Sequence, residues 1–173
     1  MIVRPTPIEG LLIIEPTVIE DQRGYFYESF NQLKWRKNTG LDTHFVQDNQ
    51  ARSTMGVLRG LHFQKGKAAQ AKLVRCTEGS VFDVAVDLRT DSPTFKRWFG
   101  IELTQDNHLQ LFIPRGFAHG YLALTEYATF TYKCDNFYNK SAESGLPYND
   151  PEIGIEWPAI EGEYFLSEKD LKW

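Results

Sequence analysis

Short stretches of alternating apolar and polar residues follow one another through the middle of the chain and predict β-strands. The alternation is most regular over 80–87, where three valines supply β-branched side chains. Turn signals rich in Gly, Pro, Asn and Asp separate the predicted strands. The strands are predicted over residues 11–16, 57–63, 72–76, 80–87, 98–103, 109–114, 120–124 and 128–136. Several short strands at this spacing indicate a β-sandwich or barrel.

Helical periodicity is nearly absent, and the sequence predicts only a few short helices. One helix is expected over 31–38, because Asn31 can cap its start and Gly40 can end it. A second is expected near Ser167, with Glu168 and Asp170 in its first turn. With no repeat, low-complexity tract or linker, residues 1–173 are expected to form a single domain. The strand over 11–16 could pair with its own sheet or exchange with that of a partner.

Composition narrows the class of protein. Hydrophobic residues make up 42%, charged residues 24%, and the net charge is −4, which is typical of a globular protein. The absence of a Lys/Arg run argues against nucleic-acid binding, and apolar stretches such as 11–14 are too short to cross a membrane. Cys76 and Cys134 lie far apart and no signal peptide precedes them, so we expect buried thiols and a cytoplasmic protein.

One motif points to a barrel interior. Residues 114–119 match the Pro-x-Gly-x-x-His element of cupin jelly rolls, in which Gly116 permits a tight turn and His119 then points inward. Metal-binding cupins carry an earlier His-x-His, whereas here Phe63 follows His62 where the sequence reads Leu-His-Phe-Gln. A transition metal needs about three protein ligands, so the sequence predicts that no metal is bound.

Without a metal, the barrel residues suit proton transfer beside a carbonyl group. His62 is a candidate base, because an unperturbed imidazole has a pKa of about 6.5. Tyr132 is a candidate acid, and the ammonium group of Lys72 could stabilise an enolate oxygen. Each residue alone also has a structural interpretation, as a strand histidine, a core aromatic and a solvated charge. On spacing alone, the sequence predicts a cupin-like barrel with a candidate acid–base site.

Nine ordered segments give the chain a specific resemblance to the dTDP-4-dehydrorhamnose 3,5-epimerase family. They are residues 21–30, 45–49, 56–64, 70–76, 82–89, 92–95, 113–120, 132–138 and 166–170. The resemblance implies an all-β jelly roll of the cupin type. It also implies removal and return of a proton at both carbons beside the ketone of dTDP-4-keto-6-deoxy-D-glucose. No cofactor is implied, because the carbonyl of the substrate accepts the electrons.

The resemblance also implies roles for individual residues. His62 is similar to the catalytic base, Asp170 to its orienting carboxylate, Tyr132 to the acid and Lys72 to the enolate-stabilising cation. Tyr138 matches a ring that stacks on thymine. Members of the family are homodimers in which part of the site can come from the partner subunit. The positions that match substrate-binding residues are Arg23, Phe26, Glu28, Gln47, Asp48, Asn49, Arg59, His119, Tyr138, Glu143 and Lys169.

One segment departs from the family pattern, and other functions remain open. Ser144 and Tyr148 replace an arginine and a tryptophan, and Pro147 is unusual. These changes affect the role expected for Glu143 more than the roles expected for the catalytic residues. An epimerase of a single centre would share the same catalytic residues. A sugar-nucleotide ketoisomerase would differ around the first histidine. A non-catalytic cupin that binds a nucleotide sugar would not need an acid facing a base.

Overall fold

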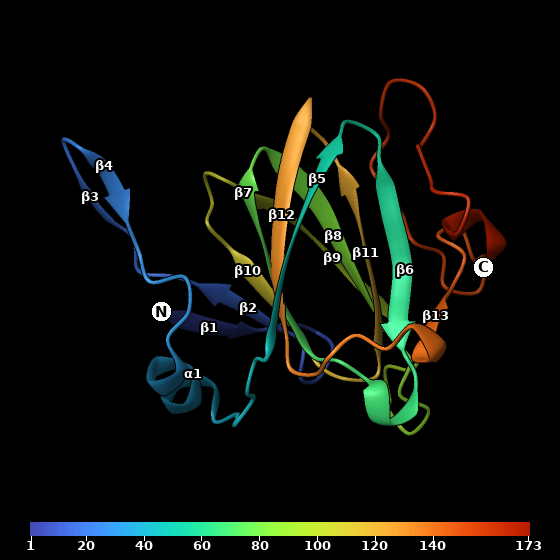
Figure 1. The fold of residues 1–173 in the computed structure, drawn as a ribbon, viewed down its shortest axis with the longest axis horizontal. Coiled ribbons are helices and arrows are strands. Elements are labelled where there is room, and N and C mark those ends of the chain that lie inside the picture. The colour runs from blue at the N-terminus through green and yellow to red at the C-terminus, as the bar shows by residue number, and fades with distance from the viewer.

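Two antiparallel β-sheets face each other and form the body of the computed structural model, which describes all 173 residues (Figure 1). The strands in chain order are β1 (Ile2–Pro5), β2 (Leu12–Glu15), β3 (Ile19–Asp21), β4 (Gly24–Phe26), β5 (Gln47–Thr54), β6 (Leu58–Gln64), β7 (Lys72–Glu78), β8 (Ser80–Asp87), β9 (Trp98–Thr104), β10 (Gln110–Ile113), β11 (Phe117–Ala123), β12 (Tyr127–Cys134) and β13 (Glu143–Gly145). One sheet has the order β1-β2-β10-β7-β12-β5 and the other the order β13-β6-β11-β8-β9. This is the cupin-type jelly roll that the sequence predicted.

A small hairpin stands apart from these two sheets. Strands β3 and β4 pair only with each other, and Figure 1 shows them projecting away from the body beyond β1 and β2. Three apolar side chains of the hairpin, Ile19, Tyr25 and Phe26, are exposed. An exposed apolar hairpin of this kind is typical of a segment that contacts another molecule.

Every strand that the sequence predicted is present, and the structure adds five more. The added strands are β1, β3, β4, β5 and β13. The most consequential of them is β5, whose sequence Gln-Asp-Asn-Gln-Ala-Arg-Ser-Thr has no apolar alternation. Strand β11 also begins at Phe117 rather than at Gly120 as predicted, because the turn at Gly116 is complete within one residue of positive φ (88°).

The helices are few and short. Helix α1 (Gln32–Thr39) begins after Asn31, which accepts a hydrogen bond from the Lys34 N–H, and ends at Gly40, as predicted. The 3₁₀ turns are η1 (Gly66–Ala68), η2 (Lys140–Ala142) and η3 (Asp170–Lys172). The short helix predicted near Ser167 forms as the 3₁₀ turn η3, which has Asp170 in its first turn but does not include Glu168. The Ser167 hydroxyl donates to the Asp170 carboxylate and accepts from the Asp170 backbone N–H, as a capping serine does at the start of a helical turn.

Three apolar clusters hold the layers together. The largest lies between the sheets and includes Val74 and Phe130 from one sheet and Val81 from the other. Trp35 of α1 packs on the outer face of the six-stranded sheet, and Trp157 packs with residues on the outer face of the five-stranded sheet. None of the helices has the length and apolar character needed to cross a membrane.

Candidate active site

The predicted acid and base face one cavity of about 110 Å³ between the two sheets. The cavity lies where β5, β6, β7, β12 and β13 come together, so both sheets contribute to its wall. Its lining residues are Gln47, Asn49, His62, Phe63, Gln64, Gln70, Lys72, Tyr132, Cys134, Tyr138 and Glu143. Sequence reasoning alone had not assigned a role to Gln64, Gln70 or Cys134.

Strand register explains why distant polar residues meet in this cavity. In the six-stranded sheet, Tyr132 lies opposite Asn49 of β5, and Cys134 lies opposite both Gln47 of β5 and Lys72 of β7. Side chains two residues apart on a strand share a face, so these residues all line the cavity. A one-residue shift of register would turn them to the outer face.

His62 contacts a carboxylate that lies 108 positions away in the sequence. Its Nε2 lies 2.5 Å from Oδ1 of Asp170, whose side chain is almost fully buried. The other oxygen of Asp170 accepts a hydrogen bond from the Ser167 hydroxyl at 2.9 Å. Burial lowers the pKa of His62 below its ordinary value, and Asp170 opposes that effect. The imidazole is therefore neutral at neutral pH, as a general base requires.

Tyr132 and Lys72 complete a set of proton-handling groups. Burial raises the pKa of Tyr132 to about 12, so its hydroxyl keeps its proton at neutral pH. Burial also lowers the pKa of Lys72, whose Nζ lies 5.8 Å from the centre of the Tyr132 ring. A protonated phenol can donate a proton and a nearby amine can hydrogen-bond to a developing oxyanion. The cavity thus brings together a base, an acid and an electrophilic group.

A second carboxylate–imidazole pair lies deeper between the sheets. His119 of β11 lies opposite His62 of β6, and its Nε2 is 2.8 Å from Oδ2 of Asp83. The aromatic ring of Phe130 stacks on the imidazole at 5.9 Å. The second oxygen of Asp83 is buried and has no hydrogen-bond partner. Sequence reasoning assigned no role to Asp83, although a carboxylate between Val81 and Ala85 on the inward face of a strand was a usable signal.

The close approach of β6 and β11 brings the two histidines opposite each other. A Cβ atom on Gly60 would lie 2.6 Å from the Cα of Gly120 and 2.9 Å from the carbonyl oxygen of His119. Only glycine fits at such a distance, and Gly60 also has a positive φ of 131°. Arg59, just before it, donates from Nε to the Ser53 hydroxyl at 3.1 Å.

Charged and aromatic side chains surround the opening of the cavity. The Tyr138 hydroxyl donates to Glu143 at 3.1 Å, and Lys169 forms an ion pair with the same carboxylate. Burial alone would raise the pKa of Glu143, but Lys169 and Tyr138 lower it overall. Gln47 accepts a hydrogen bond from the Tyr138 backbone N–H at 3.0 Å. These contacts place Glu143, Tyr138 and Lys169, all predicted substrate-binding residues, on one side of the opening.

Seven predicted substrate-binding residues are not in the lining of this cavity. Arg59, His119 and Lys169 are described above, and four others lie on the hairpin, after it or on the other face of β5. Arg23 and Phe26 lie on the projecting hairpin, where Arg23 pairs with Asp21. Glu28 follows the hairpin and forms an ion pair with Lys34.

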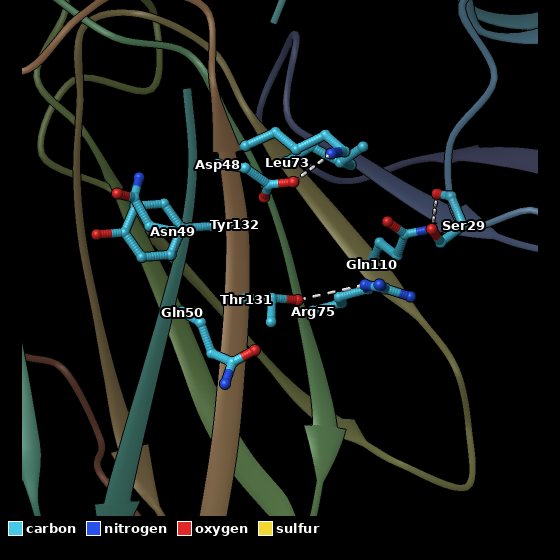
Figure 2. A pocket seen from close by; sticks show the side chains of 10 residues that line it. Ser29, Asp48, Asn49, Gln50, Leu73, Arg75, Gln110, Thr131 and Tyr132 are labelled. Atoms are coloured by element: carbon cyan, nitrogen blue, oxygen red, sulfur yellow. Dashed lines mark hydrogen bonds and ion pairs between the residues drawn. The ribbon is translucent and has the colours of Figure 1, made fainter. Parts of the chain in front are cut away.

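Asp48 is the fourth, and it lies on the opposite face of β5 from Gln47 and Asn49. It pairs with Lys133 at 2.7 Å. It lines a different cavity of about 310 Å³ on the outer face of the six-stranded sheet, together with Arg75 and Gln110. Asn49 and Tyr132 also border that outer cavity, but Figure 2 shows their side chains on the side away from Arg75 and Gln110.

The imidazoles each have a carboxylate partner rather than a set of metal ligands. No group of three or more His, Cys, Asp or Glu side chains is arranged to hold a metal ion. Phe63 occupies the position after His62 and lines the cavity. Cys76 and Cys134 are buried free thiols, as predicted.

Comparisons with known proteins show which family this chain resembles in sequence and fold. A family model described as dTDP-4-dehydrorhamnose 3,5-epimerase matches residues 5–173. The chain is 54% identical to the dTDP-4-dehydrorhamnose 3,5-epimerase of Salmonella typhimurium over 158 residues, which cover 91% of this chain and 86% of that protein. It is 46% identical to a solved dTDP-6-deoxy-D-glucose-3,5-epimerase from Legionella pneumophila in complex with dTDP-4-keto-L-rhamnose, with a TM-score of 0.95 and coverage of 98% and 89%. It is also 35% identical to a 3'-monoepimerase from Streptomyces bikiniensis in complex with dTDP-quinovose, with a TM-score of 0.91 and coverage of 97% and 84%.

Proposed function

Because the chain belongs to the dTDP-4-dehydrorhamnose 3,5-epimerase family, whose members are isomerases, we propose that its cavity epimerises both carbons beside the ketone of dTDP-4-keto-6-deoxy-D-glucose. The observation that carries the proposal is the convergence of His62, Lys72 and Tyr132 on one cavity, with Asp170 bonded to the imidazole. Pure binding of a nucleotide sugar would not need a base supported by a buried carboxylate.

His62 acts as the base in this proposal. Asp170 accepts the hydrogen bond of Nε2, which leaves the lone pair of Nδ1 to take a proton from the carbon beside the ketone. The electron pair of the broken C–H bond moves onto the carbonyl oxygen and forms an enolate. Lys72 hydrogen-bonds to that oxygen and stabilises its charge. The substrate carbonyl is the electron acceptor, so the cycle proposed here uses no cofactor.

Tyr132 returns the proton in this proposal. Its hydroxyl donates to the opposite face of the enolate carbon, and the C–H bond re-forms with inverted configuration. The phenolate then takes a proton back from water, and His62 releases its proton to water. A pKa of about 12 suits this role, because the phenol stays protonated until the enolate, a strong carbon base, is presented to it.

The nucleotide part of the substrate fits the groups around the opening. Tyr138 is half exposed and offers a ring on which thymine can stack. Arg59 offers a guanidinium group, which suits diphosphate oxygens because it can bind two of them at once. Gln47, Asn49, Glu143 and Lys169 contribute further polar groups on the wall or at the opening, and His119 lies beside the sugar. The Legionella relative was solved with a dTDP-sugar bound.

Hydrogen exchange in heavy water tests the reaction. We expect mass spectrometry and NMR of recovered dTDP-4-keto sugar to show deuterium at both carbons beside the ketone. The matched variant is Tyr132→Phe, in which His62 still removes and returns protons on its own face. That variant should exchange protons while forming at least about 100-fold less inverted product.

A single-centre epimerase is the second candidate, favoured by the similarity to the Streptomyces bikiniensis 3'-monoepimerase. Deuterium at one carbon only would replace the main proposal with this one. No exchange at either carbon, with intact binding of the nucleotide, would leave a binding protein and overturn both.

The proposal includes a homodimer in which the hairpin β3–β4 reaches the site of the partner subunit. Its exposed Tyr25 and Phe26 support this arrangement, as does the position of Arg23 far from the cavity of its own chain. In a twofold symmetric dimer, each site would then combine His62 of one subunit with Arg23 of the other.

Subunit mixing tests the shared site. His62→Asn and Arg23→Ala should each be strongly impaired, but a heterodimer of the two contains one site with neither defect. After unfolding and refolding together in equal amounts, activity should recover to about a quarter of that of the unmodified protein. Recovery would fail if both residues acted within one chain, and sedimentation analysis would show whether a dimer forms at all.

A cytoplasmic location is also part of the proposal. Cys76 and Cys134 are free thiols in the structure, and unpaired cysteines are the norm in reducing compartments. Fractionation of cells, followed by detection of the protein with an antibody, tests this point, and recovery in a secreted or membrane fraction would contradict it.

A further inference from the structure

The carboxylate that supports the base lies in a segment with few attachments to the barrel. The segment begins after Phe165, whose backbone bonds to Gly56 and to Leu58, the first residue of β6. From residue 166 onward, only two hydrogen-bonded contacts reach the barrel: Asp170 to His62 and Lys169 to Glu143. The other hydrogen bonds join residues within 167–172 and shape the turn without fixing its position.

Apolar packing supplies the missing attachment at one point. Residues 166–173 contain three large apolar side chains: Leu166 is partly buried, Trp173 is 37% exposed and Leu171 is 68% exposed. The indole of Trp173 covers the bare backbone of Gly145 in β13. A Cβ atom on Gly145 would lie 2.5 Å from Nε1, 2.6 Å from Cε2 and 2.7 Å from Cδ1 of that ring.

The position of this contact ties it to the catalytic pair. Gly145 is the strand partner of His62 in the pairing of β13 with β6. The indole therefore rests on the residue beside the base, and Asp170 lies three positions before the indole in the same segment. A segment attached at Trp173 and at Phe165 holds Asp170 from both sides.

We propose that Trp173 and Gly145 form a clamp that positions Asp170 against His62, so that both are positioning residues for the epimerisation. This inference rests on the proposed function for its consequence in catalysis, but the clamp itself is a statement about structure. Glycine at position 145 leaves room for the ring, and the ring holds the carboxylate in place. A displacement of about 1 Å at such a pair can cost about 100-fold in rate.

Two substitutions and two controls test the clamp. Trp173→Ala removes the ring, and Gly145→Ala inserts a methyl group where the ring lies. Leu171→Ala is the matched control, because that side chain is in the same turn and is mostly exposed. Trp173→Phe keeps a flat apolar ring and should restore most of the function lost in Trp173→Ala.

We expect Trp173→Ala and Gly145→Ala to lower kcat by about 10- to 100-fold while KM changes by less than about twofold. The double variant should be no worse than Trp173→Ala, because no ring is left for the methyl group to displace. Leu171→Ala should match the unmodified protein. Thermal unfolding of each variant shows whether the fold survives.

The NMR titration of ¹³C-labelled His62 gives a measurement that does not depend on activity. The groups that face this imidazole are Asp170 and Lys169 from the segment, Lys72 from β7 and Glu143 from β13. Because Asp170 raises the pKa of His62, its displacement in Trp173→Ala should lower that pKa.

The outcomes separate the clamp from the proposed function. An unchanged kcat and an unchanged His62 pKa in folded Trp173→Ala would overturn the clamp, as would an equal loss in Leu171→Ala. If the unmodified protein epimerises nothing, the proposed function fails, and the titration still decides whether Trp173 holds Asp170.

Discussion

The two carboxylate–imidazole pairs of the barrel have the same components and differ in where those components come from. His119 and Asp83 lie on adjacent strands of one sheet, 2.8 Å apart, with side chains 8% and 0% exposed. His62 is 28% exposed and faces the cavity, and its partner Asp170 comes from a turn 108 positions later. The first pair is fixed by the sheet itself, whereas the second depends on a segment packed on the outside of the barrel.

The difference between the pairs indicates which imidazole performs the chemistry. A general base must reach the substrate, and it needs a partner that adjusts its pKa. His62 lines the cavity and is bonded to Asp170, which raises its pKa. His119 is closed in by Phe130 and by Asp83, one of whose oxygens has no partner at all. Buried polar groups make a structure more rigid when all their hydrogen bonds are formed, and they destabilise it when some are missing. We therefore assign proton removal to His62 in the proposed reaction, and for the less accessible His119 we propose only the contact with the sugar.

The largest expected effect comes from removing each imidazole in turn. His62→Asn should lower kcat by about 1000-fold or more, because a general base contributes on that scale. His119→Asn should cost about 10-fold, mainly as a higher KM for the dTDP-sugar, because it removes a binding contact. Steady-state kinetics under one buffer condition distinguish the two. Equal losses of kcat in both variants would remove the distinction between the pairs.

Replacing a carboxylate should lower kcat less than replacing His62, and it should also shift the pH profile. Asp170→Asn should lower kcat by about 100-fold and move the acid limb of the kcat/KM profile to lower pH. The sign follows because burial already lowers the pKa of His62 and Asp170 raises it, so loss of the carboxylate charge lowers it further. In the unmodified protein the acid limb should lie below pH 6.5. A limb that moves upward in Asp170→Asn would contradict the role of that pair.

Asp83→Asn is the matched variant of the other pair. We expect the acid limb to stay in place, because His62 and not His119 is the titrating base. The free energy of unfolding should fall by about 1–3 kcal/mol, since a charged hydrogen bond to His119 becomes a neutral one. Urea unfolding measures this loss. A shifted acid limb in this variant would mean that His119, and not His62, is the base.

The smallest expected effect is that of chelators. Neither pair belongs to a group of three metal-binding side chains, so treatment with EDTA or phenanthroline should leave the rate within about 10% of its starting value. A loss that zinc or iron restores would revive a metal-dependent interpretation of the two histidines.

Much of the barrel could be predicted because its strands alternate apolar and polar residues. The inward face of β8 carries Val81 and Ala85, and such a strand has only one stable orientation against a core. Strand β5 could not be predicted in this way. One of its faces lines the polar cavity through Gln47 and Asn49, and the other is exposed. Its sequence therefore lacks the alternating apolar residues by which a strand is predicted.

The sequence by itself determined eight of the thirteen strands, the capped helix at Asn31, the turn at Gly116 and the candidate acid and base. It could not place Asp170 on His62 from spacing, because no local rule relates residues 108 positions apart. Only the tertiary structure decided that contact, through the packing of residues 166–173 against β6 and β13. Tertiary structure also turned Asp48 away from the cavity that Gln47 and Asn49 share, because neighbours on a strand point to opposite faces.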